Sequence, residues 1–275
     1  MKYLSSFNDA GLFSKKEWLF DNKTCNNLQY MLPIYIFILS YSIYKYSKNM
    51  DFKKIFLIIF IAFVIADLMT AIFHCYYIDR SFSNDIINIE NDYLIINTAY
   101  GYAANHHMFP SNWKDISDKT LYITLLSIFF IPLILINIYI KYNEIGFLLT
   151  LIIFFMVISP IIHKYCHEKN HNRYVPPIID FFINNKILLH PNKHSKHHFN
   201  NIYDWSLLNG ISDPLVNNFI RMKCDLLNIC PKEEIIKSCK DYSKKYNTDI
   251  IKIKFIGDIE GKLNVKLIGN LFIYA

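Results

Sequence analysis

Ten histidines are distributed unevenly along this chain of 275 residues, and eight of them lie in short groups or at the end of an apolar stretch. In the densest group, at residues 190–198, three histidines form the pattern H-x-x-H-H. Neutral imidazole binds iron, zinc and copper well, so these residues indicate a metal site. The candidate ligands are His74, His106, His107, His163, His167, His194, His197 and His198. The other two, His171 and His190, are expected to be ordinary polar residues.

The spacing within two of the groups places their histidines on common faces of helices. His163 and His167 are four residues apart. His194 precedes His197 and His198 by three and four residues. Eight ligands are too many for one metal ion, whereas two ions with about four ligands each retain room for oxygen or water. We therefore predict a two-metal catalytic site, and the absence of H-E-x-x-H disfavours a zinc protease.

Two carboxylates stand near the first histidine. Asp67 precedes His74 by seven residues, which is about two helical turns along nearly the same face. A carboxylate within a membrane span is costly and needs a partner. We expect Asp67, and similarly Asp79, to accept a hydrogen bond from a ligand histidine and so fix its tautomer. For Asp67 the alternative is an N–H or hydroxyl partner such as Thr70.

The elements that must position these residues are four apolar stretches, at residues 31–44, 55–78, 121–140 and 145–163. A helix of about 20 apolar residues crosses the hydrocarbon core; the last three stretches meet this length, and the first is shorter. Their apolar residues lie all round the helix, without the polar face of a helix on a soluble protein. The sequence therefore predicts an all-α integral membrane protein with four transmembrane helices.

Four crossings would place every histidine group and both termini on one side of the membrane. Residues 163–275 on that side carry 17 of the 29 Lys and Arg residues, so the positive-inside rule predicts that this side is cytosolic. The lysines at positions 45, 48, 53 and 54 oppose this orientation, because they would lie in the loop on the other side.

The expected organisation has three parts. Residues 1–30 form an N-terminal cytosolic segment, and residues 31–224 form the membrane domain with a cytosolic histidine-rich di-metal cap. Residues 225–275 form a small C-terminal α/β appendage, in which an amphipathic helix precedes a strand, a turn and a second strand. No signal peptide is evident at the start of the chain, which carries charges throughout.

Composition and charge limit the partners. The chain is 53% apolar with a net charge of +6, and its lysines stand beside apolar stretches. This pattern favours an anionic membrane surface or an acidic protein over nucleic acid, which we do not expect as a partner. The six cysteines form no C-x-x-C pair and are interpreted as reduced thiols.

Taken together and in order, these motifs resemble the Kua family of membrane lipid desaturases, which includes plasmanylethanolamine desaturase and a plant plastid fatty acid desaturase. The resemblance covers residues 55–220. It rests on ADLMTAIFH (66–74), NHHMFP (105–110), HKYCH (163–167), INNKILLHPNKHSKHH (183–198) and NGISDPLVN (209–217). The positions that match the family's motifs are Asp67, Thr70, Pro110, Lys164, Pro191 and the eight candidate histidines.

Several positions depart from the family pattern and leave the eight histidines intact. They are Ala71 in place of Gly, Cys75 in place of Trp, Asp79 one residue later than usual, His190 in place of Ser, and Asp213 in place of Asn. These departures affect the expected surroundings of the ligands and the substrate specificity.

The resemblance implies a desaturase that uses O2 and two electrons to remove two hydrogens from a lipid chain, with two iron ions at the eight histidines. The preferred substrate is a 1-O-alkyl ether phospholipid, which would become the vinyl ether of a plasmalogen. A phospholipid acyl chain is the next choice. Electrons would come from a cytosolic donor such as cytochrome b5 or a ferredoxin, attracted by the lysine-rich face. The expected location is the endoplasmic reticulum or another endomembrane.

Other functions remain open at this point. A lipid hydroxylase would use the same oxidant and differ only in how the reaction ends. From another class, the chain could be a non-catalytic metal-binding membrane protein, although such a protein would not need a buried carboxylate at position 67. A haem protein is disfavoured because haem needs axial histidine pairs within the bilayer, and these histidines lie at span ends and in loops.

Overall fold

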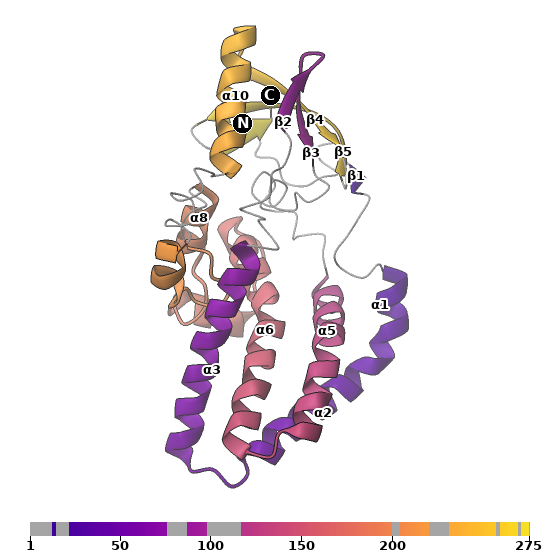
Figure 1. Cartoon of the computed structure of the whole chain (residues 1–275), viewed down its shortest axis with the longest axis vertical. Helices are drawn as coiled ribbons and strands as arrows, with labels where there is room; N and C mark the ends of the chain where they lie inside the picture. The colour runs from indigo at the N-terminus through magenta and orange to yellow at the C-terminus, as the bar shows by residue number, and fades with distance from the viewer. Residues whose placement is uncertain are drawn as a thin grey trace.

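The computed structural model describes residues 13–14, 22–75, 87–97, 117–199, 204–219, 231–256, 259–268 and 271–274. Helices and short strands form two parts, with the helical bundle below and a sheet with one helix above it in Figure 1. The helices are α1 (Asn22–Leu28), η1 (Gln29–Met31), α2 (Leu32–Ser47), α3 (Phe52–Phe73), α5 (Asp118–Tyr139), α6 (Asn143–Asn170), α7 (Pro177–Asn184), α8 (Pro191–Phe199) and α10 (Pro231–Tyr246). Residues 213–219 are also helical.

Three helices of the described residues are long and apolar enough to cross a membrane: α3, α5 from Leu121 to Tyr139, and α6. Their outward faces carry large apolar side chains, such as Phe56, Leu57 and Phe60 on α3, each 58% exposed. Such a continuous exposed apolar surface is unsuited to water and typical of contact with lipid. These helices support the prediction of a membrane protein.

The first predicted span is shorter, because α2 has 16 residues. However, α1, η1 and α2 follow one another without a break and run beside α5. At one end, Lys119 Nζ donates to Gln29 Oε1 at 2.5 Å. At the other end, Lys45 Nζ donates to the Asn137 carbonyl oxygen at 2.8 Å. Residues 22–47 therefore extend along nearly the whole length of α5, which favours a fourth crossing; the count of four stays a prediction.

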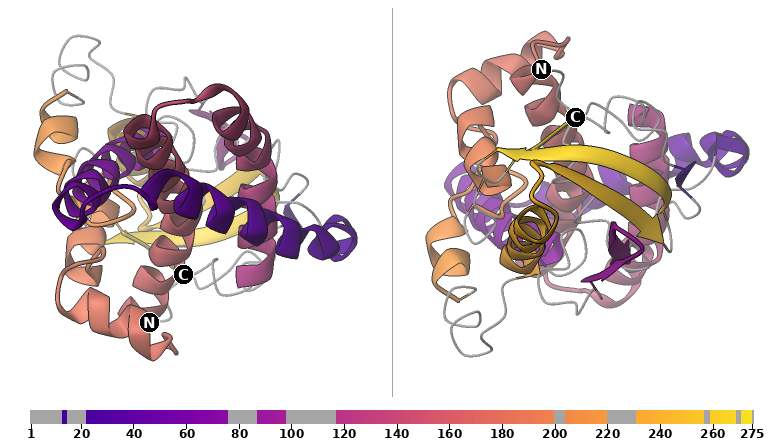
Figure 2. Two further views of the ribbon diagram at one scale, coloured as in Figure 1. Left: turned by 90° about the horizontal axis from the view of Figure 1, so that it is seen from below. Right: turned by 90° about the horizontal axis from the view of Figure 1, so that it is seen from above.

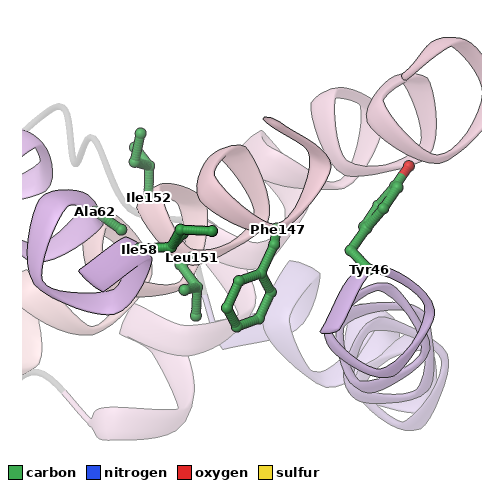
Figure 3. Close-up of a cluster of buried hydrophobic side chains, with 6 residues drawn as sticks. All are labelled: Tyr46, Ile58, Ala62, Phe147, Leu151 and Ile152. Atoms are coloured by element: carbon green, nitrogen blue, oxygen red, sulfur yellow. The ribbon is translucent and has the colours of Figure 1, made fainter. Parts of the chain in front are cut away.

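The helices pack through a cluster of buried side chains on α2, α3 and α6, shown in Figure 3. Tyr46 lies across α6 at Gly146, where a Cβ atom would collide with the tyrosine ring. The Tyr46 hydroxyl donates to the Ile136 carbonyl oxygen at 2.9 Å, so the ring is held between α5 and α6. The absence of a side chain at position 146 is what permits this close packing.

The sheet contains β1 (Phe13–Ser14), β2 (Ile87–Glu90), β3 (Tyr93–Asn97), β4 (Ile250–Ile256), β5 (Ile259–Ile268) and β6 (Leu271–Tyr274). The strand order is β1-β5-β4-β3-β2, with β6 also paired to β5. The pair β3–β4 is parallel and the others are antiparallel. Strands from three parts of the chain meet here, so residues 225–275 do not form the sheet alone. The division of the chain at residues 30 and 224 remains a prediction.

The hairpin β2–β3 was not predicted from the sequence. Its turn residues Asn91 and Asp92 both have positive φ, at 47° and 63°, as a type I′ turn requires. The usual signal for such a turn is Asn-Gly or Asp-Gly, and this turn has no glycine.

The helix α10 was predicted from the sequence. Its Tyr242 hydroxyl donates to the Asp92 carbonyl oxygen at 2.8 Å.

Candidate metal centre

Two helices bring four of the candidate histidines together. His163 and His167 lie on α6, His194 and His198 lie on α8, and all four are buried. One ring nitrogen of each lies within 4.8 Å of the corresponding nitrogens of the other three. The i, i+4 spacing in each helix directs both of its side chains to one side, and α8 packs against the end of α6.

The contacts among these nitrogens are more numerous than hydrogen bonding explains. His194 Nε2 lies 2.8 Å from His163 Nε2, 3.0 Å from His167 Nε2 and 3.0 Å from His198 Nε2. His163 Nε2 and His167 Nε2 are also 3.0 Å apart. A ring nitrogen carries either one hydrogen or one lone pair, so it cannot make three good hydrogen bonds at once. Several lone pairs directed at one point are instead the arrangement that a metal ion completes.

The spacing also suits metal ligation quantitatively. With a metal–nitrogen bond of about 2.1 Å, two ligands at right angles are about 3.0 Å apart, and two tetrahedral ligands about 3.4 Å apart. The observed 2.8–3.0 Å is closer to the right-angle value. The residues present therefore fit a metal ion held by their ring nitrogens.

His74, at the end of α3, and His197, on α8, lie beside this four-histidine cluster and are fully buried. Their ring centroids are 4.7 Å apart, and the His74 ring is 5.2 Å from that of His163. His74 Nδ1 lies 2.8 Å from the Trp205 carbonyl oxygen. A carbonyl oxygen only accepts, so Nδ1 carries the hydrogen and Nε2 carries the lone pair. This is the tautomer that a metal-binding imidazole needs.

The remaining predicted residues are not part of the described cluster. His106, His107 and Asp79 lie outside the described residues, so their placement stays a prediction. His190 accepts a hydrogen bond at Nδ1 from the Asn192 backbone N–H at 3.2 Å, and His171 caps the end of α6. The pKa of each of these two imidazoles is lowered, mainly because the ring is partly buried, and the lower pKa favours the neutral form.

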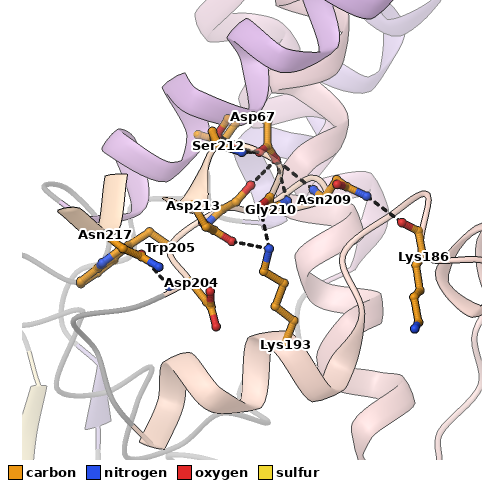
Figure 4. A network of polar contacts seen from close by, with 12 residues as sticks. Asp67, Lys186, Lys193, Asp204, Trp205, Asn209, Gly210, Ser212, Asp213 and Asn217 are labelled. Carbon is orange, nitrogen blue, oxygen red and sulfur yellow. Dashed lines mark hydrogen bonds and ion pairs between the residues drawn. The ribbon is translucent and has the colours of Figure 1, made fainter. Parts of the chain in front are cut away.

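Asp67 has a different partner from the one expected. Its buried carboxylate accepts no hydrogen bond from a histidine among the described residues; it binds the loop at residues 206–212 (Figure 4). Oδ2 accepts from the Ser212 N–H at 3.0 Å and from the Ser212 hydroxyl at 2.7 Å. Oδ1 accepts from the Asn209 N–H at 2.9 Å, the Gly210 N–H at 3.2 Å and the Ser206 hydroxyl.

The expected histidine partner is therefore not found among the described residues, where the partners of Asp67 are of the alternative kind, N–H and hydroxyl groups. These partners do not include Thr70, whose hydroxyl donates to the Asp67 carbonyl oxygen within the helix at 2.9 Å. Five donors from one loop satisfy both carboxylate oxygens, which a single imidazole N–H could not do.

A second buried carboxylate, that of Asp213, connects the same loop to α8. Asp213 Oδ1 accepts from the Ser206 N–H at 2.8 Å, and Oδ2 pairs with Lys193 Nζ at 2.9 Å. Lys193 also donates to the Gly210 carbonyl oxygen at 2.6 Å. Burial raises the pKa of Asp213 to about 6, although Lys193 acts in the opposite direction. Gly210 has a φ of +90°, which favours glycine, and a Cβ there would collide with Lys193.

These contacts connect two helices that carry or precede candidate ligands, α3 and α8, through the 206–212 loop. Asp67 on α3 holds the 206–212 loop, the Trp205 carbonyl preceding that loop orients His74, and Lys193 joins the loop to α8 beside His194. Sequence reasoning did not assign Lys193 or Trp205. The available signal was that SLLNGISD at 206–213 contains Asn, Gly, Ser and Asp residues, which are typical of turns.

Comparison with known proteins gives one match. A family model described as a lipid desaturase domain matches residues 63–220, more than half of the chain. The matched region contains all eight candidate histidines, Asp67 and Asp213. No curated protein and no solved structure matches the chain.

Proposed function

This chain belongs to the lipid desaturase domain family, and on that premise we propose that it is a membrane desaturase with a di-iron centre and O2 as co-substrate. The observation that carries the proposal is the convergence of the His163, His167, His194 and His198 ring nitrogens at the ends of two helices. One ion would take these four histidines. The second would take His74 and His197 beside them, together with His106 and His107.

The chemistry divides between the cofactor and the chain. A di-iron centre at these residues would supply the oxidation that removes one hydrogen from each of two adjacent carbons and leaves a double bond. O2 is the oxidant; with the two hydrogens, two electrons and two protons it becomes two water molecules. The Trp205 carbonyl keeps His74 in the tautomer with its Nε2 lone pair available. Full burial of His74, His163 and His197 keeps bulk water from these candidate ligands.

The substrate that we propose is the chain of a membrane phospholipid. A 1-O-alkyl ether phospholipid, converted to the vinyl ether of a plasmalogen, is the first choice, and a phospholipid acyl chain is the second. Four crossings would put the histidines and both termini on the cytosolic side of the endoplasmic reticulum or another endomembrane. Cytochrome b5 or a ferredoxin would donate the electrons there.

The experiment is lipid analysis of cells that lack ether-lipid and acyl-chain desaturases and express either this chain or its His163→Ala variant. A lipid product lighter by two hydrogens, present only with the unmodified chain, supports a desaturase. A product heavier by one oxygen supports a lipid hydroxylase. Unchanged lipids, with the protein folded, iron-loaded and supplied with a reductase and donor, contradict both and favour a non-catalytic metal-binding protein.

A further inference from the structure

The outer face of α7 is apolar, as is its inner face. Ile183 is fully buried against the side chains of α5 and α6. On the opposite side Ile178 and Phe181 are 68% and 58% exposed. The polar edge between the faces is formed by Asp180, whose carboxylate pairs with Lys169. A short helix with both broad faces apolar is unsuited to water on its outer side.

The helical segment at residues 213–219 likewise has a buried inner side and an exposed apolar outer side. Its inner side holds Asp213 and Val216, which are 1% and 4% exposed. Its outer side carries Leu215 and Phe219, which are 65% and 50% exposed and share one face because they are four residues apart. Ile211, just before the helix, is 47% exposed. Figure 2 shows this short orange helix at the outer edge of the bundle.

Both apolar faces lie at the level where the membrane core should end. The ion pair of Lys54 and Glu144, at 2.8 Å, marks the far ends of α3 and α6. A hydrocarbon core of about 30 Å takes about 20 helical residues, so it ends about 20 positions further along each helix, near residues 74 and 164. Val216 packs with Ala71 and Cys75 at this level of α3.

On α6 the corresponding contact is made by α7. Ile183 packs with Tyr165 and Ile161, which also lie near the end of the membrane core, and with Leu121 at the start of the α5 span. The outer faces of α7 and of residues 211–219 therefore continue the lipid-facing surface of the spans. Lipid is the medium already present at that boundary.

We propose that α7 and residues 211–219 are membrane-surface elements, and that their outer apolar side chains insert into the lipid leaflet on the histidine side. Apolar faces of such helices enter about 5–10 Å into the boundary between headgroups and chains. The proposal goes beyond the desaturase function, because it requires only that α3, α5 and α6 cross a membrane.

This placement has a consequence for α8, which follows α7 and precedes the 211–219 segment in the chain. The Leu189 N–H donates to the Leu208 carbonyl oxygen at 2.6 Å, and Lys193 joins α8 to Gly210. Two lipid-inserted elements on either side of α8 would hold its three histidines at the membrane surface, where a lipid chain reaches them.

The test is quenching of tryptophan fluorescence in the full-length protein, reconstituted into phosphatidylcholine vesicles that contain brominated lipids. Phe181→Trp and Leu215→Trp report the two faces. Phe60→Trp on α3 is the matched lipid-facing control, because Phe60 and Phe181 are both 58% exposed. Ile250→Trp on β4, 42% exposed, is the control outside the spans. Signals are taken relative to the unmodified protein, which contains three Trp residues.

We expect a loss of the added signal at positions 181 and 215 that is larger with bromines near the headgroup than with bromines near the chain ends, as befits interfacial depth. Phe60→Trp should respond most to bromines near the chain ends, and Ile250→Trp to neither. Quenching of positions 181 and 215 by aqueous iodide, without a bromine effect, would show faces in water and overturn the proposal. Protection from both quenchers would overturn it as well, because protein would then cover the faces. Ile178→Trp and Phe219→Trp read the same faces if a first variant fails to fold.

Discussion

Replacing Asp67 with asparagine should weaken the hydrogen bonds that hold the 206–212 loop, which follows the Trp205 carbonyl that orients His74. The amide keeps one acceptor oxygen and replaces the other with an NH2 group that cannot accept. If the oxygen faces Ser206, Asn209 and Gly210, the two bonds from Ser212, at 3.0 and 2.7 Å, are lost. Hydrogen bonds to a charged group contribute about 1.5–3 kcal/mol each, so the loss is about 3–6 kcal/mol.

A graded series separates this cause from general damage. Ser212→Ala removes only the hydroxyl bond and should cost about 1.5–3 kcal/mol. Ser159→Ala is the matched control, because Ser159 is also buried, in α6, and its hydroxyl donates only to the Met156 carbonyl oxygen. It should cost no more than about 0.5–1.5 kcal/mol, the range of a neutral hydrogen bond.

The assay is thermal unfolding of the iron-loaded protein in detergent, together with its desaturase activity. With about 2–4 °C per kcal/mol, Asp67→Asn should lower the unfolding temperature by about 6–24 °C, with Ser212→Ala intermediate and Ser159→Ala least affected. Unchanged unfolding temperatures for Asp67→Asn and Ser212→Ala would refute the reasoning. If Ser212→Ala leaves the unfolding temperature unchanged while Asp67→Asn loses all its metal, the carboxylate would act directly on a metal ligand.

Three further predictions have defined outcomes. Because the pKa of Asp213 in the folded chain is raised to about 6, its protonated form is favoured by folding, and its contribution to stability falls as pH rises from about 4 to 7; Asp213→Asn should flatten this part of the unfolding profile, and an identical profile would contradict it. His167→Ala and His197→Ala should each abolish desaturation and lower bound iron, whereas His171→Ala should retain both; activity in either of the first two variants would break the ligand assignment. Gly146→Ala should cost about 1–3 kcal/mol through collision with the Tyr46 ring, seen as a lower unfolding temperature.

The spans and histidine groups are the features that the sequence predicts best, because both follow from local patterns. Apolar length alone identifies α3, α5 and α6. The i, i+4 spacing indicates that His163 and His167 share a face, and the structure brings six of the eight candidate histidines together. The lipid desaturase domain agrees with the resemblance at the level of lipid desaturases; membership of the Kua group remains a proposal.

The features that sequence reasoning missed depend on distant or weak signals. The cost of burying Asp67 was predictable, but its partners lie about 140 positions away and include three backbone N–H groups, which no side-chain type reveals. The β2–β3 turn lacks the glycine that usually marks it. The α7 helix has eight residues, too few for an apolar run to distinguish a core helix from one at the membrane surface.

The most direct test of the central claim is metal analysis of the detergent-purified, iron-replete protein beside its His194→Ala variant. His194 Nε2 lies within 3.0 Å of three other ring nitrogens, so this residue is central to the cluster. The account predicts close to two irons per chain and a clear loss in the variant. One zinc per chain, or no transition metal under reducing conditions, would contradict it.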